Sequence, residues 1–197
     1  MSNKWRRLGG LYAGLVLFGV SIGLMVRAGL GLDPWDVLHQ GLAGRTGLPL
    51  GWIVNLTAVL VLLLWFPLRQ RPGLGTVSNV IVVGLAVDAT LAAVAEPHHL
   101  GWRVAFLVTA IVGNGAATGL YIGAGLGPGP RDGLMTGLAA RGHSIRVMRT
   151  AIEATVLVLG WLLGGTVGIG TVLYAVSIGP LAQFFIAKLE VRPCATA

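Results

Sequence analysis

The chain contains one sequence unit twice, at an offset of about 95 residues. Residues 28–42 read AGLGLDPWDVLHQGL and residues 124–138 read AGLGPGPRDGLMTGL, with nine of the fifteen positions identical. A second match follows in each unit, GLGTV at 73–77 and GIGTV at 168–172. Internal repeats with glycine and proline interruptions at matching places are typical of many transporter folds. The duplication therefore predicts two halves with the same fold.

The composition places this duplicated unit in a membrane. Hydrophobic residues make up 55% of the chain, charged residues make up 11%, and the mean hydropathy is +0.81. A helix needs about 17–25 apolar residues to cross the hydrocarbon core. Six stretches approach that length: 11–26, 52–68, 76–95, 104–123, 150–164 and 171–187. We expect an all-α membrane protein with about six transmembrane helices in a single domain, 1–197, with repeats at about 8–97 and 102–190.

The basic residues are unevenly distributed among the segments between these stretches. If the chain crosses six times, eleven of the 14 Lys and Arg residues fall on the side of the termini and three on the other side. Cytoplasmic segments are enriched in Lys and Arg, so both termini are expected in the cytoplasm. The net charge of +7 then reflects topology and contact with anionic lipids at the cytoplasmic face. Nucleic-acid binding is not expected.

Each repeat also contains a short helix outside the long apolar stretches. Three spans per repeat is an odd number, so the second repeat is expected to have inverted topology. In the first connection, 27–51, Asp33 is a predicted N-cap and Pro34 a first-turn residue. The helix is predicted to end at Gly44, which gives about half a membrane thickness. It is either an amphipathic helix in the interface or a re-entrant half-helix, and 124–147 is expected to match it.

Five segments, taken in chain order, carry a family resemblance. They are GLGLDPWDVL (29–38), GLGTVSN (73–79), GLGPGPRDGLMTGLAARG (125–142), RTAIEATVLVLGWLLGG (149–165), and GIGT with GP (168–171 and 179–180). The chain resembles the YczE/YyaS/YitT-like family of bacterial integral membrane proteins, in particular its YczE branch. This resemblance implies a multi-pass protein of the bacterial plasma (inner) membrane. Trp35 stands where the second copy has Arg131, and Glu153 has no counterpart, so a shared site is asymmetric.

Acidic residues at matched positions are the first candidates for a functional site. Asp36 and Asp132 are most simply helix caps. Two half-helix starts with Arg27 and Arg131 close to them are also suited to an anionic or amphiphilic solute. Asp88 lies inside the third apolar stretch, and Gln183 occupies the matching place in the sixth. An ionisable group in a membrane is costly, so Asp88 either binds a cation or proton or reaches interfacial water.

Further polar residues are candidates for the same solute path. Arg149 and Glu153 are four residues apart on one helix face. They form either a structural ion pair or a pair that gates or contacts the solute. Intramembrane polar residues can line a path or form interhelical hydrogen bonds, and the candidates are Asn79, Asn114, Tyr121 and Tyr174.

Metal, cofactor and catalytic sites are not expected. His98 and His99 have no further ligands nearby, and Cys194 is the single cysteine. No HExxH motif occurs, and an enzyme is not expected. The repeat predicts a small-solute transporter or permease that works by alternating access. The alternative is a non-transporting membrane protein that regulates or scaffolds partners. A homo-oligomer is compatible with both, and the sequence does not identify the solute.

Overall fold

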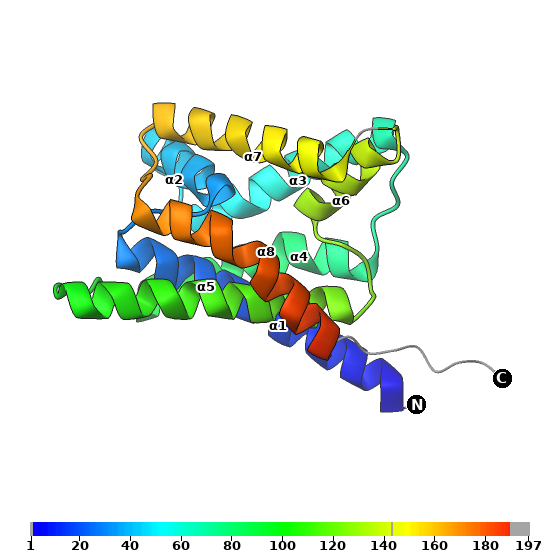
Figure 1. Ribbon diagram of the computed structural model, residues 1–197, viewed down its shortest axis with the longest axis horizontal. Coiled ribbons are helices and arrows are strands. Elements are labelled where there is room, and N and C mark those ends of the chain that lie inside the picture. Colours follow the sequence, from blue (N-terminus) through cyan, green and yellow to red (C-terminus); the bar gives the residue numbers. More distant parts are fainter. Residues whose placement is uncertain (1, 143, 190–197) are drawn as a thin grey trace.

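The computed structural model describes residues 2–142 and 144–189. Within these ranges the chain forms eight helices and no strand, which confirms the all-α prediction. The helices are α1 (Ser2–Ala28), α2 (Pro34–Thr46), α3 (Leu50–Leu68), α4 (Leu74–Ala93), α5 (Leu100–Gly123), α6 (Pro130–Ala139), α7 (Ile145–Leu162) and α8 (Ile169–Leu189). Figure 1 shows α2 and α6 as short helices among the six longer ones.

Five of the helices are long and apolar enough to cross a membrane: α1, α3, α4, α5 and α8. They account for five of the six predicted stretches. The remaining stretch is α7, whose 18 residues include the charged side chains of Arg146, Arg149 and Glu153. The structure therefore supports five membrane-spanning helices where six were expected, and a crossing by α7 stays a prediction.

Glycine faces bring the long helices close together. A side-chain carbon at Gly19 of α1 would lie 2.5 Å from the carbonyl oxygen of Val83 on α4. At the matching position of α5, a side-chain carbon at Gly115 would lie 2.8 Å from Leu181 on α8. Only glycine permits approaches this close, so these positions fix α1 against α4 and α5 against α8. α1 and α5 also pack against each other.

The two short helices lie inside the bundle and not on its surface. In Figure 1, α2 and α6 begin near the middle of the molecule and run toward opposite ends. α2 buries six of its 13 residues and packs on α7 and α3, while α6 packs on α3 and α7. Both short helices therefore pack against longer helices, and a re-entrant position in the membrane stays a prediction. α2 ends at Thr46, two residues beyond the predicted Gly44, because the left-handed residue that closes it is Gly47 (φ 72°).

The turns before the short helices are held by hydrogen bonds between the two halves of the chain. The carbonyl oxygen of Leu30 accepts the N–H of Gly170 at 2.8 Å, and that of Leu126 accepts the N–H of Gly75 at 2.8 Å. The glycines that follow the two leucines have φ angles of 115° and 116°, a conformation that only glycine adopts readily. Each half therefore fixes the start of the other half's short helix.

A pair of arginines holds the same turns from the side. Arg7 donates two hydrogen bonds, each 2.6 Å long, to the carbonyl oxygens of Ala124 and Gly125. Arg103 makes the matching pair of bonds, each 2.7 Å long, to the turn before α2. We did not predict this pair from the sequence. The signal that could have found it is their offset of 96 residues, which equals the offset of the two motifs.

The halves differ in one helix pair. α3 packs extensively against α4, whereas α7 packs on α2 and has at most slight contact with α8. At the α3–α4 contact, the Gly51 N–H donates to Asp88 Oδ1 at 2.7 Å and the Gly84 N–H donates to Asn55 Oδ1 at 3.1 Å. No hydrogen bond joins α7 to α8 in the described part of the chain. The α3–α4 pair is therefore in close contact, whereas the matching α7–α8 pair is not.

Candidate functional site

A cavity of about 280 Å³ lies where the starts of α2 and α6 approach α5, α7 and α8, and every helix contributes to its lining. The structure brings eight of the ten predicted site residues to this cavity: Asn79, Asn114, Arg131, Asp132, Arg149, Glu153, Tyr174 and Gln183. Asp36 and Asp88 do not line it. Their contacts are described below, and the roles of all ten in a solute path stay predictions.

The two half-helices begin at the cavity with different caps. The Asp33 carboxylate accepts the N–H groups of Trp35 at 2.8 Å and Asp36 at 3.0 Å, which confirms Asp33 as the N-cap of α2. The matching residue of α6 is Gly129, which has no side chain to cap the helix. The two half-helices therefore present different chemistry to the same cavity.

Polar atoms surround the position where α6 lacks a capping side chain. A side-chain carbon at Gly129 would lie 3.0 Å from Asp132 Oδ2, 3.4 Å from Asn79 Nδ2 and 3.6 Å from the Tyr121 hydroxyl oxygen. The Tyr121 hydroxyl donates a hydrogen bond to the Asp132 carboxylate. No basic side chain of the described residues forms an ion pair with Asp132. This part of the cavity therefore holds a carboxyl group whose hydrogen-bond partner is a hydroxyl donor.

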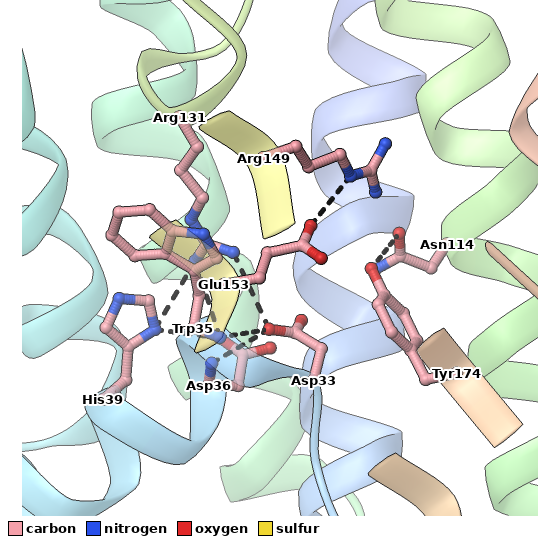
Figure 2. Close-up of polar contacts among 9 residues, drawn as sticks. All are labelled: Asp33, Trp35, Asp36, His39, Asn114, Arg131, Arg149, Glu153 and Tyr174. Atoms are coloured by element: carbon pink, nitrogen blue, oxygen red, sulfur yellow. Dashed lines mark hydrogen bonds and ion pairs between the residues drawn. The ribbon is translucent and has the colours of Figure 1, made fainter. Parts of the chain in front are cut away.

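Arg131 joins the start of α6 to the start of α2. Its guanidinium carbon lies 5.0 Å from the ring centre of Trp35, in a cation–π contact. Its nitrogens lie 3.9 Å from Asp33 Oδ1 and 3.6 Å from Asp36 Oδ1. Figure 2 shows Arg131 reaching down beside Trp35 toward the two aspartates. Trp35 and Arg131 occupy matched positions in the two motifs. The two copies therefore contact each other through a pair of positions at which their residues differ.

His39 also belongs to this cluster, although it was not among the residues predicted from the sequence. Its Nδ1 lies 2.8 Å from Asp36 Oδ1 and 3.5 Å from an Arg131 nitrogen. His39 and Asp36 are each 1% exposed. His39 Nε2, Asp36 Oδ2 and Trp35 Nε1 are buried without a hydrogen-bond partner in the described structure. The only available signal was the three-residue spacing of Asp36 and His39, which places them on one helix face.

Arg149 and Glu153 form the predicted ion pair. Arg149 Nε donates to Glu153 Oε1 at 2.9 Å, and both residues line the cavity. Since their side chains are 47% and 29% exposed, the pair contributes little to stability by itself, about 0.3–0.5 kcal/mol. Its place beside the cavity keeps both predicted roles open, the structural one and the gating one.

Asn114 of α5 and Tyr174 of α8 lie on the opposite side of the cavity from Trp35 (Figure 2). The Tyr174 hydroxyl donates to Asn114 Oδ1 at 3.3 Å. This contact is an interhelical hydrogen bond, which was one of the two predicted interpretations. Asn114 is 3% exposed and still reaches the cavity wall, so the other interpretation, a place along a solute path, also stays a prediction.

Asp88 and Asn55 seal α3 against α4 away from the cavity. Asp88 accepts the N–H of Gly51 in the first turn of α3, so it caps a helix whose preceding residue, Pro49, has no capping side chain. This contact satisfies one of the N–H groups that a helix start leaves free. A structural role accounts for Asp88 at this place, and binding of a cation or a proton stays a prediction.

A metal site would require several carboxylate, thiolate or imidazole groups close to one another. Within residues 2–142 and 144–189, no group of three or more His, Cys, Asp or Glu side chains is arranged to hold a metal ion. Cys194 lies outside the described residues. The sequence-based expectation of no metal and no cofactor stays an expectation.

The chain is similar to several bacterial proteins over most of its length. A family model described as a family of unknown function (DUF6198) matches residues 5–187. An uncharacterized protein of Haemophilus influenzae is 45% identical over 93% of this chain and 84% of its own length. The uncharacterized membrane protein YczE of Bacillus subtilis is 34% identical over 90% of this chain and 84% of its own.

A third relative, the uncharacterized protein YyaS of Bacillus subtilis, is 29% identical over 90% of each chain. No solved structure matches the chain. These matches confirm the resemblance to YczE and YyaS, and the apolar helices agree with a membrane location. The chain belongs to the DUF6198 family of YczE- and YyaS-like proteins.

Proposed function

We propose that this chain is a carrier that moves a small solute across the bacterial plasma membrane by alternating access between two inverted repeats. The observation that carries the proposal is the cavity, which lies where the half-helices α2 and α6 meet and which both halves line. Carriers built from inverted repeats hold their solutes at such crossings of interrupted helices. The proposed activity is binding and movement of a solute, without catalysis.

The helix contacts support an inverted repeat. α1 packs on α4 as α5 packs on α8, and α2 packs on α7 as α6 packs on α3. We take α7 as the sixth crossing, with its charges at the cytoplasmic end and at the cavity. Each half then crosses three times, so the second half is inverted relative to the first. The Lys and Arg distribution places both termini in the cytoplasm, where basic segments contact anionic lipids.

The difference between the two matched helix pairs supports an inward-facing state. In the proposed orientation, Gly51 and Asp88 lie in the outer half of the membrane, and their hydrogen bond closes α3 against α4. Arg149 and Gln183 lie in the inner half, on helices that do not pack against each other. The site is therefore closed toward the outside and open in the inner half of the membrane.

Labelling of a single cysteine in the cavity tests alternating access. Cys194→Ala removes the only thiol of the chain, and Ala182→Cys then places one in the α8 wall of the cavity. A membrane-impermeant maleimide should label this cysteine both in inverted vesicles and in intact spheroplasts. Val176→Cys, on the exposed face of α8, is the matched control. It should react from neither side because it faces lipid.

Labelling of Ala182→Cys from one side only, or from neither side, would contradict the carrier. Such a result would favour the alternative, a membrane protein that regulates or scaffolds partners without transport. The chain with Cys194 intact provides the orientation control, since this residue should be labelled in inverted vesicles and not in spheroplasts. Labelling of Cys194 from outside would overturn the proposed topology.

A further inference from the structure

We infer that the solute of the proposed carrier is a hydrophobic organic cation, and that it enters from the lipid bilayer through the gap between α7 and α8. This inference rests on the proposed function and adds the class of solute and its route. Two separate features of the cavity lead to it: the packing of the helices that border the cavity, and the charges and apolar groups that line it.

α7 and α8 both border the cavity and have at most slight contact with each other. α7 contributes Arg149 and Glu153 to the lining, and α8 contributes residues from Tyr174 to Ile186. Figure 2 shows Arg149 and Glu153 of α7 on one side and Tyr174 of α8 on the other. Gly179 belongs to the α8 wall, and a side-chain carbon there would meet nothing within 4 Å. An opening between two helices of a membrane protein faces lipid, so a solute dissolved in the bilayer can reach the cavity.

The matching positions in the other half are sealed. Gly84 of α4 is the repeat counterpart of Gly179, and a side-chain carbon at Gly84 would lie 2.1 Å from Asn55 Oδ1. Asp88 is the counterpart of Gln183 and accepts a hydrogen bond from α3. Two α4 positions therefore close α3 against α4, whereas their two counterparts on α8 border an opening. The opening is a specific difference between the halves and not a general looseness of packing.

The charges of the cavity favour a cation. Three carboxylates line it, those of Asp33, Asp132 and Glu153, together with two guanidinium groups, those of Arg131 and Arg149. Glu153 is paired with Arg149, and Asp33 shares Arg131 with a buried neighbour. Among the described residues, Asp132 forms no ion pair and accepts a hydrogen bond from the Tyr121 hydroxyl. It lies in the first turn of α6, where the helix dipole stabilises negative charge.

The rest of the lining is suited to an organic cation rather than a hydrated metal ion. Aromatic rings of Phe18, Tyr121 and Tyr174 lie in the wall, and the faces of such rings attract organic ammonium or phosphonium groups. Ile122, Ile178 and other aliphatic side chains complete it. A small hydrated ion would gain nothing from these groups. A cation with apolar substituents would contact both the rings and the Asp132 carboxylate.

Binding of tetraphenylphosphonium to the protein in phosphatidylcholine nanodiscs tests the inference, with empty nanodiscs as the partition control. Tetraphenylborate has the same shape and the opposite charge. The protein should bind the phosphonium and not the borate. Asp132→Asn should weaken binding by at least about tenfold, because it removes the unpaired negative charge. Glu96→Gln, at an exposed residue outside the cavity, should not change it.

The route is tested by the rate of association with the same probe. Gly179→Trp and Gln183→Trp, which narrow the opening, should slow association of the phosphonium. Gly101→Trp is the matched control, because a side-chain carbon at Gly101 also meets nothing within 4 Å but lies away from the cavity. Unchanged association in both tryptophan variants would overturn entry between α7 and α8. Binding of the borate, or of neither ion, would overturn the cationic solute, while cysteine labelling from both sides would still support the carrier.

Discussion

At the residue scale, Arg103 shows a charged side chain that serves backbone structure. Its guanidinium donates two hydrogen bonds to the carbonyl oxygens of Ala28 and Gly29, each at 2.7 Å. These carbonyl groups follow the last turn of α1, where no helical partner is available. Gly29 has a φ of 60°, so the chain leaves the helix at this point. The arginine therefore fixes the direction in which the chain enters the bundle.

Arg103→Gln should lower the free energy of unfolding by about 2 kcal/mol, since a charged donor contributes about 1.5–3 kcal/mol and glutamine is shorter and neutral. Thermal unfolding of the purified protein in detergent measures the effect. Arg45→Gln is the control, because Arg45 is exposed and its contact with the Leu163 carbonyl oxygen is 3.4 Å long. Equal melting temperatures for the two variants would show that Arg103 does not hold the turn.

The residues of the site could be predicted from the sequence more easily than their contacts. Asp33 was predicted as an N-cap because Asp-Pro at a helix start is a local signal. The contact of Arg131 with Trp35 and Asp36 was not predicted, because it joins residues about 95 positions apart and depends on how the half-helices cross. His39 was missed for the same reason: one buried histidine gives no signal until its partners are placed.

At the element scale, the half-helices depend on the turns that precede them. The start of α2 was predicted from local sequence, whereas its burial was not, since amphipathic and re-entrant helices of this length look alike in sequence. The burial of α2 follows from its contacts with α7 and α3. α7 is remote in the chain, and the contact with α3 depends on the direction that the turn before α2 gives to the helix. The same limit applies to α7, where Arg149 and Glu153 pair with each other and line the cavity.

Gly31→Ala should destabilise the protein by more than about 2 kcal/mol, because a non-glycine residue at positive φ alone costs about 1–3 kcal/mol. Gly31 has a φ of 115°, and its added carbon would also lie 2.7 Å from the backbone nitrogen of Gly168. Thermal unfolding in detergent again provides the measurement. Gly101→Ala, in a helix with open space around it, should be neutral or slightly stabilising. A Gly31→Ala variant as stable as this control would refute the role of the turn.

At the scale of the whole molecule, the two halves are alike in their turns and different in one helix pair. Internal repeats in the sequence predicted the matched turns, because both copies retain the same glycines. They did not predict that α3 packs on α4 while α7 stays apart from α8. A repeat specifies which contacts each half can make. Which half makes them depends on the state of the protein, and the central claim is that the two halves exchange these states.

Distances across both helix pairs test that claim most directly. In a Cys194→Ala background, spin labels at Leu60 and Leu85 report on α3 and α4, and labels at Val158 and Val176 report on α7 and α8; all four side chains are exposed. Double electron–electron resonance measures both distances in lipid bilayers, in acidic and neutral buffer, with and without tetraphenylphosphonium. The two distances should change in opposite directions, so that α3 and α4 separate when α7 and α8 approach each other. A single unchanged distance for each pair under all these conditions would contradict a carrier.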